Sequence, residues 1–261
     1  MRLAFFGDIV GKPGRRAVGR ALGALRTAER IDFVVANAEN SAGGVGVDPG
    51  SARELFAAGV NVLTSGNHVW AKRQIVEYIA DSDVLLRPAN FAPSTPGWGY
   101  TVKPCPRGEP VGVINLIGRV FMGTYDCPFR TVDGVLASIR EKARVVLVDM
   151  HAEATSEKVA MGWYLDGRVS AVVGSHTHVQ TADERILPGG TAYVTDAGMC
   201  GPIDSVIGVS REQVLRRFLT QMPTRFEVAD GRVLVQGVVV DVDHATGKAT
   251  SIRRIQEVVE Q

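Results

Sequence analysis

The sequence has few cysteines, no excess of either charge and no long apolar run, and each shortage excludes a class of protein. Its 261 residues include three cysteines, an odd number at wide spacing, which forms neither a disulfide framework nor a CxxC metal motif. The formal charge of +1 disfavours a dedicated nucleic-acid binder, because such proteins cluster cations against phosphates. No apolar run approaches the roughly 18 residues that span a bilayer, and the start MRLAFFGDIVG lacks a signal-peptide cleavage pattern. We therefore expect a reduced, cytoplasmic protein with no membrane-binding and no dedicated nucleic-acid-binding surface.

The composition that is present is globular, and its apolar runs alternate with helical stretches. A hydrophobic content of 45% with 22% charged residues is sufficient for a folded core. Short apolar runs followed by loops and helices are typical of α/β folds with neighbouring parallel strands. The expected strands are 2–6, 31–36, 60–64, 111–117, 145–150 and 170–174, and the expected helices are 13–29, 49–58, 70–80, 132–142 and 156–165.

Two other regions have a different character. The Pro- and Gly-rich residues 88–110 predict irregular structure with short antiparallel strands. Beyond about residue 185 the pattern is mostly β, with one helix expected over 211–220 and strands over 226–228, 233–241 and 249–255. No repeat, low-complexity tract or linker interrupts the chain, so residues 1–261 are expected to form a single domain.

Polar side chains gather where the expected strands end, and in open α/β sheets ligands bind beyond the carboxyl ends of the strands. Each residue taken alone could have a structural role instead of a ligand role. Asp8 could belong to a Gly-Asp turn, Asn67 could be a helix N-cap, and each histidine could be a hydrogen-bonded surface group. Together, converging carboxylates, amides and imidazoles predict a metal site. The candidates, which include four of the five histidines, are Asp8, Glu39, Asn40, Asn67, His68, His151, His176 and His178.

The types of donor atom limit which metal ions could bind. Oxygen donors of Asp, Glu and Asn with imidazole nitrogen and no thiolate suit Mn, Fe, Zn or Co. There are too many donors for one tetrahedral ion. They fit two ions that share a bridging carboxylate, the arrangement used for in-line displacement at phosphorus.

The motifs Gly66-Asn67-His68 and Gly174-Ser175-His176-Thr177-His178 resemble those of the calcineurin-like metallophosphoesterases, whose signature runs D-x-H, GD-x-x-D, GNH, H and GH-x-H. More closely, the segments FGDIVG, NAENSAGG, TSGNHVW, DMHAEATSEK and SHTH resemble the YmdB-type subfamily. This resemblance implies a four-layer α/β/β/α sandwich and a dinuclear metal site. It also implies phosphodiesterase activity, notably on 2′,3′-cyclic nucleotides.

The resemblance further implies a role for each ligand. Glu39 bridges the two ions. The first ion takes Asp8, Glu39, Asn40 and His178, and the second takes Glu39, Asn67, His151 and His176.

The chain departs from the superfamily signature at three positions. Val10 stands where the first histidine is usual, Glu39 replaces the bridging Asp, and Val69 replaces the Glu after GNH. The oxygen of Asn40 is expected to substitute for the missing histidine. The third change removes the residue that would fix the ring of His68.

The expected reaction is attack of a metal-bridging hydroxide on phosphorus. His68, the one histidine of the cluster not assigned to a metal, is expected to protonate the leaving ribose oxygen as general acid. The expected cofactor is two divalent or mixed-valence ions, Fe or Mn ahead of Zn, and a homo-oligomer is expected on base rates.

Two alternatives to this reaction stay open. One is a phosphomonoesterase or protein phosphatase on the same scaffold, and the other is a regulatory metalloprotein that binds a nucleotide or RNA. Four further residues either line the nucleotide pocket or belong to the core: Arg119, Phe121, Tyr125 and Phe129.

Overall fold

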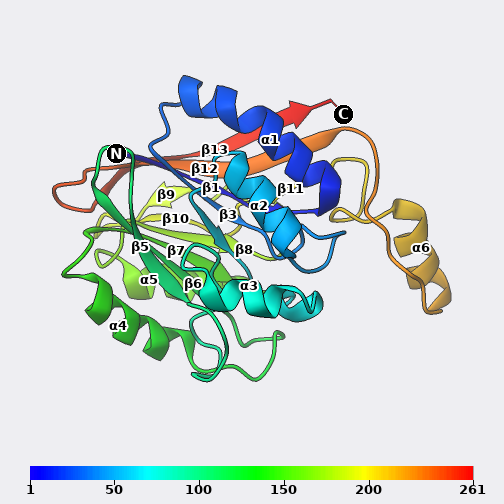
Figure 1. The fold of residues 1–261 in the computed structure, drawn as a ribbon, viewed down its shortest axis with the longest axis horizontal. Coiled ribbons are helices and arrows are strands. Elements are labelled where there is room, and N and C mark those ends of the chain that lie inside the picture. Colours follow the sequence, from blue (N-terminus) through cyan, green and yellow to red (C-terminus); the bar gives the residue numbers. More distant parts are fainter. Residues whose placement is uncertain (261) are drawn as a thin grey trace.

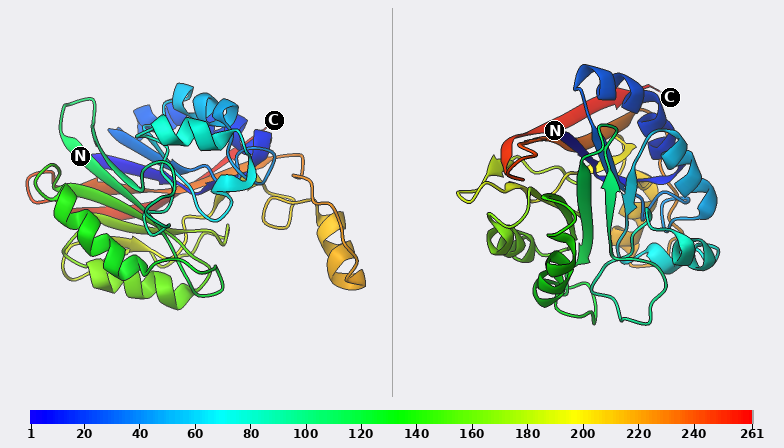
Figure 2. Two further views of the ribbon diagram at one scale, coloured as in Figure 1. Left: turned by 60° about the horizontal axis from the view of Figure 1, so that its bottom comes forward. Right: turned by 60° about the vertical axis from the view of Figure 1, so that its left-hand side comes forward.

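The computed structural model, which describes residues 1–260, consists of two β-sheets packed face to face with helices on both outer surfaces (Figures 1 and 2). The first sheet has the order β2-β11-β12-β1-β3-β4, with β13 paired to β12, and the second has the order β5-β6-β7-β8-β10-β9. The strands of the first sheet are β1 (Arg2–Phe6), β2 (Asp8–Ile9), β3 (Phe33–Asn37), β4 (Val62–Thr64), β11 (Met199–Pro202), β12 (Val233–Val242) and β13 (Ala249–Val259). Those of the second are β5 (Tyr100–Pro104), β6 (Pro110–Ile117), β7 (Val145–His151), β8 (Ala171–Ser175), β9 (Arg185–Ile186) and β10 (Ala192–Val194).

Helices cover the outer face of each sheet. The first sheet is covered by α1 (Gly11–Ala28), α2 (Pro49–Ala57) and α3 (Ile75–Asp81), with a 3-10 turn, η1 (Val69–Ala71), before α3. The second is covered by α4 (Pro128–Ile139) and α5 (Thr155–Leu165). One helix, α6 (Arg211–Thr220), projects away from the sandwich, as Figure 1 and the left view of Figure 2 show. The four-layer α/β/β/α sandwich is confirmed.

The central strands are buried on both faces, so they form continuous apolar runs. In β1, Leu3 and Phe5 point into the core between the sheets, while Ala4 and Phe6 face the helices of the first sheet. The helix α1 completes this outer core with Val18, Leu22 and Leu25, which lie on one helical face. The side chains that form the core are therefore those expected from the two-residue repeat of the strand and the 3.6-residue repeat of the helix.

Parallel pairing brings the functional strand ends together. In the first sheet β1 pairs with β3 and β3 with β4, all parallel. In the second sheet β6, β7 and β8 are parallel. The residues that follow these strands consequently meet at one edge of the sandwich.

The structure corrects several predicted elements. Residues 226–228 are not a strand, because they lie in the projecting part of the chain and form only an isolated bridge from Val228 to Val209. The helix predicted over 70–80 is divided into η1 and α3 by the extended backbone of Lys72. Helix α4 begins at Pro128, earlier than predicted, since proline fits the first helical turn. The short strands β2, β9, β10 and β11 were not predicted. No helix within residues 1–260 combines the length and apolar character that a membrane span requires.

Candidate metal centre

All seven predicted metal ligands, with His68, lie at the edge where the parallel strands end. Asp8 opens β2 directly after β1, and His151 is the last residue of β7. The others lie in loops that follow β3, β4 and β8: Glu39, Asn40, Asn67, His68, His176 and His178. The fold thus assembles from five separate segments the cluster that the sequence predicted.

Four of these residues surround one point. The Nε2 atom of His151 lies 3.0 Å from Glu39 Oε1, 3.2 Å from Asn67 Oδ1 and 3.1 Å from His176 Nδ1. One ligand atom each from Glu39, His151 and His176 lies within 4.8 Å of the other two, which makes this group a candidate metal site. Asn67 faces His151 and makes no helix cap, since η1 has no side-chain cap.

A second group of donors also contacts Glu39. His178 Nε2 is 3.6 Å from Asp8 Oδ1 and 3.2 Å from Asn40 Nδ2. The Asn40 nitrogen is also 3.4 Å from Glu39 Oε1. In this arrangement Asn40 directs its nitrogen toward His178, so a ligand role for its oxygen requires a 180° rotation of the amide.

The buried atom Asp8 Oδ1 indicates that this second group suits a cation. It has no hydrogen-bond partner within the described residues 1–260, although buried polar atoms are nearly always partnered. The other oxygen of Asp8 accepts a hydrogen bond from the backbone N–H of His176 at 3.0 Å. The carboxylate, amide and imidazole donors therefore fit a hard or borderline divalent ion.

The electrostatics of the centre favour added positive charge. Burial raises the pKa of the Asp8 carboxyl, but His178 and His151 together lower it, so the pKa lies below its usual value. In the same way His151 holds the pKa of the buried Glu39 well below its usual range. Both carboxylates are ionised. Burial lowers the histidine pKa values, yet Glu39 raises the pKa of His151 to about 9 and Asp8 raises that of His178 to about 9.

His151 and His178 each have a fixed ring orientation. Ser175 donates its hydroxyl to Asp149 Oδ1 at 2.6 Å, so its Oγ accepts from His151 Nδ1 at 2.9 Å. His178 Nδ1 donates to the carbonyl of Ile207 at 2.9 Å. Both bonds leave Nε2 facing the centre, which is how metal-binding histidines are usually oriented.

The loop that carries His176 and His178 is held by a buried ion pair. Both histidines have positive φ, 99° and 65°, a conformation that costs energy for a residue with a side chain. Between them, Thr177 donates its backbone N–H and its hydroxyl to Asp196 Oδ2, at 3.1 and 2.6 Å. The same oxygen accepts from Lys158 Nζ at 2.7 Å, and both charged side chains are buried. The ion pair of Lys158 and Asp196 therefore stabilises this loop through its contacts with Thr177.

Asn40 contacts the ring of His68. The superfamily signature has a Glu for this purpose at the position where this chain has Val69. The Nδ1 atom of His68 lies 2.9 Å from Asn40 Oδ1, and its backbone N–H donates to Glu39 Oε2 at 3.0 Å. Val69 itself is buried in the core beneath the first sheet's helices. The side chain of Asn40, next to Glu39 in the sequence, therefore contacts the His68 ring in the absence of a Glu at position 69.

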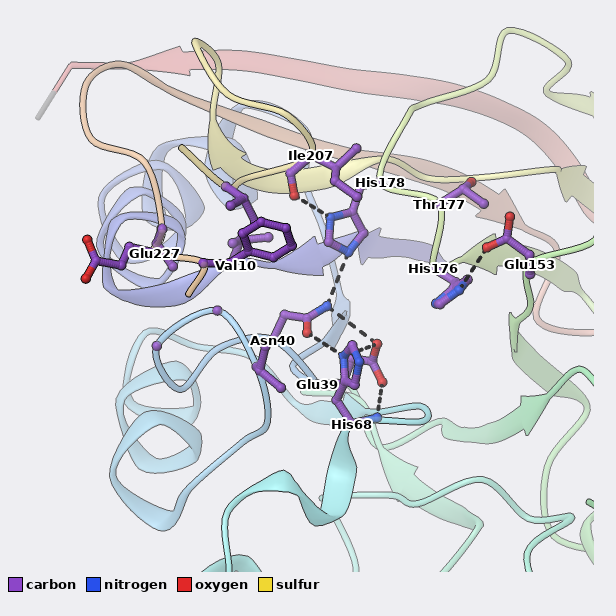
Figure 3. A pocket seen from close by; sticks show the side chains of 16 residues that line it. Val10, Glu39, Asn40, His68, Glu153, His176, Thr177, His178, Ile207 and Glu227 are labelled. Carbon is purple, nitrogen blue, oxygen red and sulfur yellow. Dashed lines mark hydrogen bonds and ion pairs between the residues drawn. The ribbon is translucent and has the colours of Figure 1, made fainter. Parts of the chain in front are cut away.

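The centre opens into a cavity of about 350 Å³ (Figure 3). Several lining residues were not predicted from the sequence: Glu153, Thr177, Ile207, Val209, Phe226, Glu227 and Val228. Glu153 Oε2 lies 3.1 Å from His176 Nε2, and its place in the DMHAEATSEK segment was the one signal that could have found it. Gly43, Gly44 and Val45, in the loop after β3, also line this cavity.

The aromatic residues weighed for the nucleotide pocket lie elsewhere. Phe121 is 89% exposed, and Phe129 packs edge-on against Tyr164. Tyr125 stacks on Phe91 with ring centroids 5.1 Å apart, beside a separate hollow. None of them lines the 350 Å³ cavity.

A family model described as YmdB-like protein matches residues 4–255. The chain belongs to this family. It is 48% identical over 98% of its length to a 2′,3′-cyclic-nucleotide 2′-phosphodiesterase of Bacillus subtilis (strain 168), of which it covers 96%. A novel phosphatase of Mycoplasma pneumoniae has a similar crystal structure, with a TM-score of 0.92 at 34% identity, over 100% of this chain and 94% of that one. A hypothetical protein from Thermus thermophilus also has a TM-score of 0.92, at 43% identity, with both chains fully covered.

Proposed function

We propose that this chain is a metal-dependent phosphodiesterase that hydrolyses 2′,3′-cyclic nucleotides. One observation carries the proposal: Oε1 of the buried Glu39 contacts both donor groups, at His151 and at Asn40, and His68 lies beside it at the wall of the same cavity. The name of the B. subtilis relative, which is similar over nearly the whole chain, supplies the substrate class.

Two metal ions are proposed to bind on the two sides of Glu39. One set is Asp8, Glu39, Asn40 and His178, and the other is Glu39, Asn67, His151 and His176. When bound, such ions lower the pKa of coordinated water and hold the non-bridging phosphate oxygens. Iron or manganese suits this set of oxygen and imidazole donors, with zinc as the next choice.

His68 is proposed to be the general acid. Hydrolysis adds the oxygen of water to phosphorus and breaks the bond from phosphorus to O2′, and O2′ must then take a proton. If the amide of Asn40 turns its oxygen toward His178, its nitrogen faces His68 Nδ1 and donates to it. The ring proton of His68 then lies on Nε2, available to the leaving oxygen. One rotation therefore serves both the ligand role of Asn40 and the acid role of His68.

Turnover of two chromogenic substrates tests the function. Bis(p-nitrophenyl) phosphate and p-nitrophenyl phosphate would be compared on one purified sample, with metal content measured by atomic emission. We expect diester hydrolysis and about two ions per chain. Hydrolysis confined to the monoester would indicate a phosphomonoesterase, and metal binding without any turnover would indicate a regulatory protein.

The substitution His68→Ala separates an acid from a metal ligand. As a general acid, His68 contributes roughly 10²- to 10⁴-fold to turnover of a diester with a ribose leaving group. The loss should be smaller with a nitrophenolate leaving group, which departs without a proton. Both ions should remain bound. An equal loss on both diesters with the metal retained would remove the acid assignment.

A further inference from the structure

The cavity has two chemically different halves. One half holds the charged and imidazole groups of the centre, including Glu39, His68 and His178. The other half is apolar and consists of Val10, Val45, Ile207, Val209, Phe226 and Val228. Three of these side chains, Val45, Ile207 and Phe226, are about half exposed, at 46%, 50% and 46%. Exposed apolar side chains grouped beside a polar centre are a feature of ligand sites.

The apolar half is supplied mainly by residues 206–228, which we name the 206–228 excursion and which contains the projecting helix α6 (Figure 1). The excursion is closed on itself by the bridges from Val209 to Val206 and to Val228. The backbone N–H of Ser210 also donates to the carbonyl of Glu227 at 3.0 Å. The part of the cavity wall that the excursion supplies, formed by Ile207, Val209, Phe226 and Val228, is therefore a folded structure and not a free loop. We call it the Phe226 wall.

This wall is joined directly to the centre. The carbonyl of Ile207 accepts the hydrogen bond from His178 Nδ1 at 2.9 Å. To present that carbonyl, Ile207 takes a positive φ of 49°, which is unfavourable for a β-branched residue and is found mainly where function requires it. On the opposite side, Gly44 packs so closely on Val228 that a Cβ at this position would lie 2.6 Å from its side chain. These two contacts hold the wall in a defined position relative to the centre.

We propose that this wall, with Phe226 as its stacking surface, is the nucleobase-binding face of the active site. The proposal rests on the proposed function. A cyclic nucleotide joins an anionic phosphate to a flat ring with apolar faces, which matches the two halves of the cavity. The volume of about 350 Å³ lies in the range of small-molecule sites. The phosphate would bind at the centre and the base would lie on Phe226.

The same geometry predicts little discrimination among bases. Base identity is read by polar groups at the base edge, and Glu227 is the charged side chain of the wall. Its carboxylate points away from His68 and His178 (Figure 3) and is bound to Gln213 Nε2 of α6 at 3.3 Å. Stacking is tolerant of sequence because every base has a π face.

A second aromatic surface competes for this role. The hollow beside Asn67 is lined by Trp70, Phe91 and Tyr125. There the rings pack on one another, with Phe91 5.1 Å from Tyr125 and 6.4 Å from Trp70. Asn67 is the one candidate ligand that reaches this hollow, whereas the Phe226 wall faces several. We therefore favour the Phe226 wall.

The test compares a substrate that has a base with one that does not. Wild-type, Phe226→Ala, Phe226→Trp, Phe218→Ala and Trp70→Ala proteins would be assayed on 2′,3′-cyclic AMP and on glycerol 1,2-cyclic phosphate. Phe218 is the matched control, because it is 77% exposed and lines the neighbouring groove of α6 but not the 350 Å³ cavity. Base stacking contributes about 1–3 kcal/mol. The ratio of kcat/KM for the two substrates should therefore fall roughly 5- to 150-fold in Phe226→Ala, chiefly through KM. It should be unchanged in Phe218→Ala and largely kept in Phe226→Trp.

Each contrary result has its own meaning. An unchanged ratio in Phe226→Ala, with both substrates hydrolysed, would overturn the base-binding wall and leave the phosphodiesterase intact. So would a fall in the ratio in Trp70→Ala instead, which would place the base in the hollow beside Asn67. Failure of the wild-type protein to hydrolyse either substrate would overturn the proposed function itself.

Discussion

Replacement of Asp196 by Asn should destabilise the protein and loosen the centre at the same time. Asp196 is fully buried, and its carboxylate accepts four hydrogen bonds, from Lys158 Nζ, from the N–H and hydroxyl of Thr177, and from the N–H of Gly198. An amide has one acceptor oxygen, so at least one of these donors would face an NH₂ group. The ammonium of Lys158, 1% exposed, would lose its counter-ion.

The magnitude follows from the burial of the pair. Removing one partner of a buried ion pair costs about 3–5 kcal/mol, because the remaining charge stays desolvated. For a chain of this size 1 kcal/mol corresponds to about 2–4 °C in Tm, so a fall of roughly 6–20 °C is expected. The exposed pair between Asp133 and Arg168, with side chains 46% and 29% exposed, is the control. Asp133→Asn should change the free energy of unfolding by less than about 1 kcal/mol.

Urea unfolding of a double-mutant cycle measures the effect. The cycle consists of wild type, Asp196→Asn, Lys158→Met and the double variant, and the coupling energy should reach about 2–3 kcal/mol, the upper end for contacting residues. Metal bound per folded chain should also fall in Asp196→Asn, because the loop of His176 and His178 loses its anchor. A cost below about 1 kcal/mol, or additive single effects, would refute this account of the pair.

Two other substitutions examine the centre itself. Glu39→Gln removes the shared charge, so metal analysis should show lower occupancy at both sites; retention of two ions would contradict the bridging role. Gly66→Ala would place a methyl group on top of His151 and of the Glu39 carboxylate. Its metal content should fall while its circular dichroism stays close to that of the wild type, and undiminished metal binding would show that the centre is less tightly packed than the structure indicates.

The strands and the site cluster could be predicted because their signals are local. The apolar runs of β1, β3 and β7 have the composition of strands buried on both faces, and polar residues follow each directly. Because the strands pair in parallel, the polar residues that follow them meet at one edge of the sheet and form one site. The ligand roles of Asp8, Glu39 and the histidines, by contrast, came from the resemblance and stay predictions.

What could not be predicted depends on distant contacts. Lys158 and Asp196 are 38 positions apart, and nothing in the local sequence shows that the two charges are buried together. The bond between Asn40 and His68 spans 28 positions. Residues 226–228 have strand composition, but Val228 forms only an isolated bridge to Val209, and Phe226 is part of a cavity wall instead. The short strands β2 and β11 exist because they pair with each other and β11 with β12.

Product analysis of 2′,3′-cyclic AMP hydrolysis by phosphorus NMR tests the central claim most directly. The purified protein would be assayed as prepared, after chelation, and after return of Mn²⁺ or Fe²⁺, with Glu39→Gln in parallel. We expect a single monoester product, 3′-AMP, formed before chelation, absent after it, restored by the metal and strongly reduced in the variant. Undiminished hydrolysis by a preparation shown to be free of metal would contradict the account.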